Sequence, residues 1–425
     1  MTRRGGFFGW QVVAAAFVLA VFAWGIGFYG PGVYLHALHA REGWSLSLIS
    51  AAITLHFLAS GLLVAWLPAL HRRCGLVAVT RAGALASAAG VLGWALAREP
   101  WHLLPAALLT ALGWAVHSGA AINAIISPWF ERRRPAALSL AYNGASMGGV
   151  VFTPLWAALI AGLGFGGAGI AVAAATLLVL WPLAGIWLRP TPAAMGLFPD
   201  GADGPAPPRA ATAEGPLKGP LWRQARFRSL AIGFALGLTA QMGLLTTLFS
   251  MLAPALGTQG AGLALSLATA CAVIGRTAVG TLLPPGADRR LAGVLNFLLQ
   301  AAGSAMLAAA AGESAPLLLG GVVLFGLGIG NLLSLPPLIA QSEWPPEQVA
   351  HVVAMVTAVN QAFYAFAPAI FGTALDAFGP VAPPVAAGLV QLVAAAVLVA
   401  GRKGRPGGTA ARMRAISPTA GKSPS

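Results

Sequence analysis

The chain has 425 residues, of which 58% are hydrophobic and only 8% are charged, and its mean hydropathy is +0.79. Ordinary globular domains carry about a quarter charged residues, so this composition excludes a fold that covers itself with a polar surface in water. In a bilayer the outward face is apolar, and every backbone group is satisfied inside helices or closed barrels.

Runs of about 20 mainly apolar residues, the length of a membrane helix, recur along the whole chain. The first run is too long, and its flanks too rich in Gly and aromatic residues, for a cleaved signal peptide. We therefore expect an all-α integral membrane protein. The predicted spans are twelve, at 8–36, 45–70, 76–97, 102–127, 136–161, 166–188, 229–254, 260–283, 289–311, 315–340, 350–375 and 381–401.

The apolar signal stops between the sixth and seventh spans, where Pro, Gly, Asp and basic residues take over, as in GLFPDGADGPAPPRA. Such a composition is typical of a linker. We expect an N-terminal six-helix bundle at 1–188, a cytoplasmic linker at 189–228, a C-terminal six-helix bundle at 229–401 and a disordered cytoplasmic tail at 402–425.

The two predicted bundles repeat several features at one sequence offset. Trp129 and Trp344 lie 215 positions apart, and Pro154 and Pro368 lie 214 apart. A shared offset indicates two pseudo-symmetric halves, the architecture in which one bundle rocks against the other during alternating access.

Lys and Arg residues gather in the termini, the linker and the turns on one side of this topology, among them residues 132–134. Only Arg41, Arg98 and Arg276 lie elsewhere. This positive-inside pattern predicts cytoplasmic termini in the plasma (cell inner) membrane. It also explains the net charge of +14 without a nucleic-acid partner.

A charge deep inside a span is costly and is a functional hypothesis by default. Arg276 is such a residue, about two-thirds of the way along the eighth span, and no acidic residue lies inside a span to pair with it. A guanidinium that faces a cavity would pair bidentately with a carboxylate. The alternative is a structural bond to backbone carbonyls.

Other bulky polar side chains lie at mid-depth in the spans expected to face a cavity. For each Asn or Gln an interhelical hydrogen bond competes with ligand contact. For each His a neutral, hydrogen-bonded ring competes with a proton-sensitive site. For Tyr29 and especially for Tyr34, anchoring at the membrane interface competes with substrate contact. The candidate substrate-binding residues are Tyr29, Tyr34, His56, His117, Gln241, Asn331, Gln361 and Tyr364, with Asn123, Asn143 and Asn360 at similar depth.

Gly144 and Gly148 form a small-xxx-small pair in YNGASMGG, which allows close helix contact. We interpret this face as a packing surface on which the two bundles meet and slide. Arg72 and Arg73, in the turn after the second span, are candidate gating residues.

Several motifs together resemble the major facilitator superfamily over essentially the whole chain, and within it the monocarboxylate and oxalate:formate antiporter branch. They are Gly43-Trp44-Ser45, Trp129-Phe130 followed by Arg133, Arg134 and Ala137, Gly144 with Gly148, Pro154-Leu155, GLFPDG, and Gly275-Arg276 with Gly280. The resemblance implies exchange or facilitated movement of small carboxylates, with Arg276 at the position of the arginine that binds the anion.

Three positions depart from the family's patterns. Arg72 replaces the aspartate of the cytoplasmic gating motif. Ala272 stands where proton-coupled carriers have an aspartate, and no lysine is present near Ala367, where oxalate exchangers have one. One buried cation neutralises one carboxylate, whereas a dianion leaves a stranded charge. We therefore expect a monoanion, moved by uniport, exchange or histidine-linked coupling.

Enzyme signatures such as a P-loop or a His-Glu-x-x-His helix are missing from the sequence. Cys74 and Cys271 offer neither a disulfide framework nor a metal cluster, so we expect no cofactor and no metal. The expected function is that of a monomeric secondary transporter of a monocarboxylate-like anion in the lipid bilayer. The alternatives are a drug or metabolite exporter and a membrane receptor or scaffold that transports nothing.

Overall fold

The computed structural model describes residues 7–131, 133–202, 204, 220–283 and 287–402. These residues form helices and connecting segments, with no strand among them. The tail after Arg402 and most of the linker core, for which disorder and a cytoplasmic position were predicted, lie outside the described residues.

Helices of the N-terminal half account for the first six predicted spans. They are α1 (Gly9–Gly27), α2 (Gly30–Glu42), α3 (Leu46–Cys74), α4 (Leu76–Ala95), α5 (Leu103–His117), α6 (Gly119–Ile126) and α7 (Arg134–Trp187).

Helices of the C-terminal half account for the remaining spans. They are α8 (Ala225–Leu282), α9 (Arg289–Ala310), α10 (Ala315–Ile329), α11 (Asn331–Glu343), α12 (Pro346–Tyr364), α13 (Ala367–Phe378) and α14 (Ala382–Arg402). Short 3-10 turns at Pro100–His102, Ala193–Met195, Pro199–Gly201 and Leu221–Arg223 lie in the connections.

Ten stretches of the described residues are long and apolar enough to cross a membrane. Two of them, in α7 and α8, have 52 and 55 residues. A straight helix of that length would reach about 80 Å, far more than a hydrocarbon core of about 30 Å. Each is broken by a glycine with non-helical backbone angles, Gly164 (φ 69°, ψ 170°) and Gly257 (φ 70°, ψ 167°). Divided there, the helices are consistent with twelve spans.

Other spans contain breaks that the sequence pattern did not locate. The first consists of α1 and α2, which meet at Phe28 and Tyr29, and it extends to Glu42 rather than to residue 36. The predicted fourth, tenth and eleventh spans are divided at Ser118, Gly330 and residues 365–366. α8 begins at Ala225, before the predicted start of the seventh span at 229.

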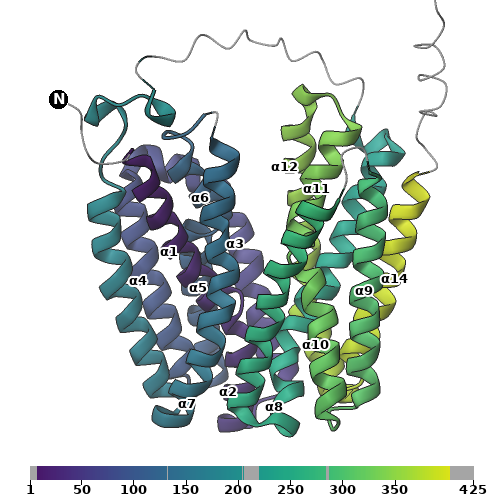
Figure 1. Ribbon diagram of the computed structural model, residues 1–425. Coiled ribbons are helices and arrows are strands. Elements are labelled where there is room, and N and C mark those ends of the chain that lie inside the picture. Colours follow the sequence, from purple (N-terminus) through teal and green to yellow (C-terminus); the bar gives the residue numbers. More distant parts are fainter. Residues whose placement is uncertain (1–6, 132, 203, 205–219, 284–286, 403–425) are drawn as a thin grey trace, which may run out of the picture.

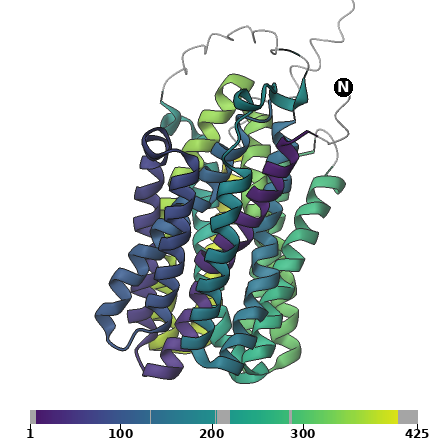
Figure 2. The ribbon, with the colours of Figure 1, turned by 90° about the vertical axis from the view of Figure 1, so that its left-hand side faces the viewer.

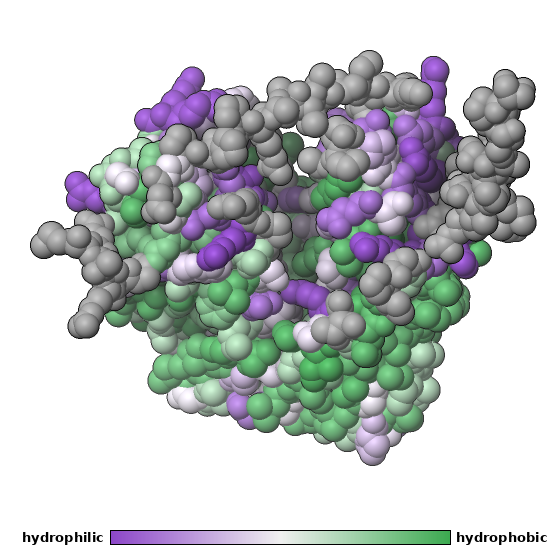
Figure 3. Space-filling model, turned by 45° about the horizontal axis from the view of Figure 1, so that its top comes forward, coloured by the Kyte–Doolittle hydropathy of each residue, from purple (hydrophilic) through white to green (hydrophobic). Residues whose placement is uncertain are grey.

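The two halves stand side by side with their helices roughly parallel (Figures 1 and 2). The starts of α1 and α8 and the ends of α7 and α14 lie at one end of the molecule, which we call the linker end. Hydrophobic residues cover the visible flanks below this end, and hydrophilic residues gather at it (Figure 3). This distribution fits a membrane protein whose linker end stands in water.

The repeat that the sequence indicated has a counterpart in the backbone. Gly164 and Gly379 both adopt a positive φ at turns opposite the linker end, and they lie 215 positions apart. Gly43 and Gly257 do the same with an offset of 214. Because a positive φ is strained for other L-residues, the matched glycines mark equivalent turns in two pseudo-symmetric halves.

The halves contact each other away from the linker end. α7 packs on α8, α3 on α13, and α2 on α8. Ser266 Oγ of α8, for example, donates to the carbonyl of Val150 in α7 at 2.7 Å. At the linker end the surface is hollowed between the halves (Figure 3). The structure is therefore closed at one end and open at the other.

Candidate functional site

Arg276 lies in the part of α8 that follows the break at Gly257, and its side chain is half-buried. Its Nε donates to the carbonyl of Gly330, at the break between α10 and α11, at 3.1 Å. The described residues offer no carboxylate within ion-pair distance and no hydrogen-bond partner for the two terminal nitrogens. Both interpretations of Arg276 therefore have a physical basis. Its Nε makes a structural bond to a backbone carbonyl, while its two terminal nitrogens remain able to bind a carboxylate.

Tyr29, in the N-terminal half, lies within electrostatic range of Arg276. It sits at the break between α1 and α2. A Cβ added at Gly149 of α7 would lie 2.5 Å from Thr269 of α8 and 2.7 Å from the Tyr29 ring. Gly149 thus leaves the space that allows Tyr29 to reach the other half.

Gln361 and Tyr364, both on α12, face the N-terminal half from the opposite direction. The Tyr364 ring lies 6.0 Å from the ring of Phe57 on α3, in an edge-to-face arrangement. Gln361 Nε2 would be 3.4 Å from a Cβ added at Gly61 of α3. These contacts place both residues at the boundary between the halves, as a site for a transported ligand requires.

His56 has a structural role that explains its buried position. Pro31 has no N–H to donate to the carbonyl of Gly27, four residues earlier, and His56 Nε2 donates to that carbonyl at 3.1 Å. Since a carbonyl only accepts, Nε2 carries a proton. Nδ1 lies 3.0 Å from Thr110 Oγ1, whose hydroxyl donates to the carbonyls of Ala106 and Ala107. Both ring nitrogens of His56 thus have partners on other helices, and a role in proton coupling stays a prediction.

Tyr34 and His117 also donate to backbone carbonyls within the N-terminal half. The Tyr34 hydroxyl bonds to Ile26 O at 3.0 Å, and its ring packs against Trp94 and Trp156. His117 Nε2 bonds to Thr80 O at 2.9 Å. The structure does not bring either residue together with Arg276.

Gln241 and Asn331 belong to a polar network inside the C-terminal half. Gln241 Oε1 accepts from Gln300 Nε2 at 3.1 Å, and Asn331 Nδ2 donates to Asn296 Oδ1 at 2.9 Å. Asn296 in turn donates to the carbonyl of Gly328 at 3.2 Å. Interhelical bonding thus accounts for both residues, although Asn331 Oδ1 and Gln300 Oε1 are buried without a partner among the described residues.

The glycine pair of α7 packs on a different surface from the one expected. A Cβ at Gly144 would lie 2.2 Å from Phe17 O, and one at Gly148 would lie 2.6 Å from Val21 O, both in α1. Close helix contact is present, but it lies within the N-terminal half. The expectation that this face forms a sliding surface between the bundles was wrong, because α1 covers it. Arg72 and Arg73 are exposed at the linker end of α3, and their gating role stays a prediction.

A polar contact that sequence reasoning missed closes the molecule opposite the linker end. Asp376 Oδ2, near the end of α13, accepts from Ser47 Oγ at 2.9 Å, close to the start of α3. One turn and two turns further along α3, Ser50 packs on Gly372, and Thr54 Oγ1 accepts from the amide of Ala369 at 3.0 Å. The only sequence signal for this closure was the spacing of small and polar residues along both helices.

Two like helical halves, closed at one end with a hollow at the other, define the architecture of a secondary transporter. The family model of the Major Facilitator Superfamily matches residues 12–368. The chain belongs to this superfamily, and the resemblance seen in its motifs is confirmed at that level. Membership also identifies it as a transporter rather than an enzyme.

A relative and two solved structures are similar to this chain. The human protein named Monocarboxylate transporter 11 is 30% identical over 239 residues, which are 54% of this chain and 46% of that protein. The match thus spans about half of the relative. A bacterial homologue of the human lysosomal transporter Spinster, inward-facing and occupied, gives a TM-score of 0.71 at 15% identity, covering 94% of this chain and 98% of that one. A mutant of the nucleoside transporter NupG gives 0.70 at 12% identity, with coverages of 93% and 99%. At such identities the two structures support the fold alone.

Proposed function

We propose that this transporter moves a small organic monoanion, of the monocarboxylate kind, by alternating access, and that Arg276 binds the negative charge. The observation that carries this proposal is that the two terminal nitrogens of Arg276, which lies inside a membrane span, have no hydrogen-bond partner among the described residues. The partial likeness to a protein named Monocarboxylate transporter 11 supports the same substrate class.

The charge of the site favours one carboxylate. Burying a second, unpaired negative charge costs several kcal/mol, and the described residues place no further cation in contact with Arg276. The Tyr29 hydroxyl would donate a hydrogen bond to a carboxylate oxygen of the substrate or to a substituent on it. Gln361 and Tyr364 would contact the substrate from α12, while Tyr34, His56 and His117 hold the helices that frame the site.

The two rocking units are the predicted bundles 1–188 and 229–401, joined by the linker 189–228, in a single monomeric chain. We place the linker end in the cytoplasm of the cell, on the evidence of the basic residues, so that the structure represents a state open to the cytoplasm. Because the described spans place no carboxylate beside Arg276, we expect uniport or anion exchange. Proton symport that uses a carboxylate at this place is not expected.

Uptake into proteoliposomes tests the proposal, with a labelled monocarboxylate, dicarboxylate and monoamine as the substrate series. We expect uptake of the monocarboxylate only, and its loss in Arg276→Gln. Arg276→Lys keeps the charge but not the bidentate fork, so its uptake should fall by about tenfold or more, the effect of losing one charged hydrogen bond.

Arg289→Gln is the matched control, because Arg289 also donates to a single backbone carbonyl, Leu338 O at 3.1 Å, but at the start of α9. The Arg289→Gln variant should take up the monocarboxylate as the wild type does. Normal monocarboxylate uptake by a folded Arg276→Gln protein would contradict the proposal. Uptake of the amine, unchanged in that variant, would favour an exporter of apolar cations instead.

A further inference from the structure

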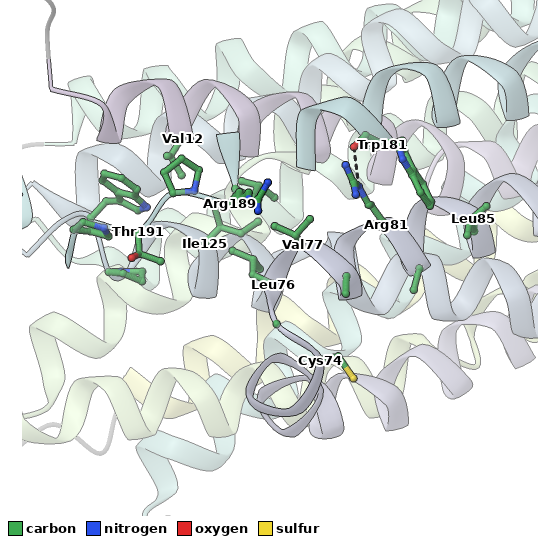
Figure 4. Close-up of a pocket in the computed structure, with 18 residues that line it drawn as sticks. Val12, Cys74, Leu76, Val77, Arg81, Leu85, Ile125, Trp181, Arg189 and Thr191 are labelled. Atoms are coloured by element: carbon green, nitrogen blue, oxygen red, sulfur yellow. Dashed lines mark hydrogen bonds between the residues drawn. The ribbon is translucent and has the colours of Figure 1, made fainter. Parts of the chain in front are cut away.

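A groove on the N-terminal half lies apart from the site between the two halves. It has a volume of about 710 Å³ and runs between the start of α4 and the end of α7, next to the connection that follows α7 (Figure 4). A second cavity of about 650 Å³ adjoins it and shares Val77, Arg81, Trp181 and Arg189. Since α4 begins and α7 ends at the linker end, the groove lies where a span meets the membrane surface.

The groove combines two cations with an apolar wall. Of the described residues that line it, Arg81 and Arg189 are the only charged ones, so no carboxylate among them neutralises the two arginines there. Arg81 is held in place, because its Nε donates to Trp181 O at 3.2 Å and its guanidinium lies 4.9 Å from the centre of the Trp181 ring. Arg189 is exposed and makes no ion pair among the described residues.

Large apolar side chains continue from the groove along the outer flank. Leu85 is 49% exposed, Trp181 40% and Ile186 56%. In a bilayer such side chains face acyl chains, and an indole at the interface sits at the level of the headgroups. A soluble anion would satisfy the two arginines but would leave the apolar wall uncovered.

We propose that this groove binds an anionic phospholipid of the leaflet at the linker end. Arg81 and Arg189 hold the phosphate by charge-assisted hydrogen bonds, and an acyl chain lies along Leu85, Trp181 and Ile186. Basic pockets between membrane helices on the cytoplasmic side have the chemistry to bind anionic headgroups. The site is independent of Arg276 and of the identity of the transported substrate.

Native mass spectrometry of the purified full-length protein in detergent tests the proposal, with phosphatidylglycerol as the probe and phosphatidylcholine as the neutral lipid. We expect preferential binding of phosphatidylglycerol. Each basic residue near an anionic headgroup contributes about fivefold in affinity, so the double variant Arg81→Gln, Arg189→Gln should bind about 25-fold more weakly. The control Arg98→Gln, Arg223→Gln removes the same charge from two exposed arginines outside the groove and should bind as the wild type does.

Cys74 provides a second readout that needs no arginine variant. It is an exposed thiol that lines the groove, whereas Cys271 is buried. Phosphatidylglycerol should slow its reaction with a maleimide, and neither phosphatidylcholine nor inorganic phosphate should do so. Equal protection by inorganic phosphate would show a site for soluble anions, and unchanged lipid binding in the folded double variant would show that the arginines bind no headgroup. Either result would overturn the proposal.

Discussion

Arg290, which is buried, and Arg276, which is half-buried, differ in how their donors are used. The Arg290 side chain is 0% exposed, and its Nε and Nη2 bond to the two carboxylate oxygens of Glu343 at 2.7 and 2.9 Å. Its remaining donors reach Ser229 Oγ and Arg226 O. Arg290 is thereby fully occupied in joining α8, α9 and α11, whereas the terminal nitrogens of Arg276 have no hydrogen-bond partner among the described residues.

Replacing Glu343 by Gln should destabilise the folded protein strongly. Removing one partner of a buried ion pair leaves an uncompensated charge and costs about 3–5 kcal/mol, so the apparent melting temperature of the purified protein should fall clearly. Arg98→Gln is the control, because Arg98 pairs with Glu42 while its side chain is 70% exposed. Such pairs contribute about 0–1 kcal/mol. Equal melting temperatures for the two variants would show that the buried pair is not needed for stability.

The polar residues of the spans were found from sequence, but their partners were not. The rarity of charge inside an apolar run identified Arg276, and polar character at mid-depth in the predicted spans identified Tyr29, Gln361 and Tyr364. Nothing in the local pattern shows that His56 replaces the N–H that Pro31 lacks, because the two residues lie on different helices. The burial of Arg290 could not be predicted from the local sequence, since it depends on Glu343, which is 53 positions away.

Helix α3 and helix α13 form the closure opposite the linker end through residues too small to keep them apart. A Cβ at Gly372 would lie 1.8 Å from Ser50 Oγ and 2.3 Å from Ser50 Cβ. Contacts this close leave no room for a methyl group without movement of one helix. The lengths and order of such helices follow from hydropathy, whereas this contact depends on which faces meet after folding.

Gly372→Ala should therefore loosen the closure between α3 and α13. It should favour the state that is open at the end opposite the linker end and closed at the linker end. Spin labels at Cys74 and at Gln341→Cys, in a Cys271→Ser background, should report a shorter distance across the linker end than they do without the Gly372 change. Adding Ser50→Gly makes room for the methyl group and should restore the original distance. A distance unchanged by Gly372→Ala would show that this contact does not control opening.

At the scale of the whole molecule, the all-helical membrane fold, which is consistent with twelve spans, and the two like halves were predictable because they follow from hydropathy and from a constant sequence offset. The matched glycines at 43 and 257 and at 164 and 379 carry that repeat into the backbone. The breaks inside the spans were less predictable, because tertiary partners such as His56 and Arg276 satisfy the backbone there.

Labelling of single cysteines should place the linker end in the cytoplasm. In a background without Cys74 and Cys271, a cysteine at Arg133, which is exposed beside the linker, should resist an impermeant maleimide added to intact cells and react in inverted vesicles. A cysteine at Trp101, 67% exposed between α4 and α5, should show the reverse. Reaction of position 133 from outside intact cells would invert the proposed topology.

The turns at Gly164 and Gly257 add almost no exposed loop to the end opposite the linker end, since each reverses the chain at a single glycine. An antibody fragment raised as a marker for electron cryo-microscopy would find few epitopes there. Most would lie on the linker end, on surfaces that move apart as the hollow opens. Such fragments should therefore select one conformation, and a panel of them would sort the particles of this small protein by state.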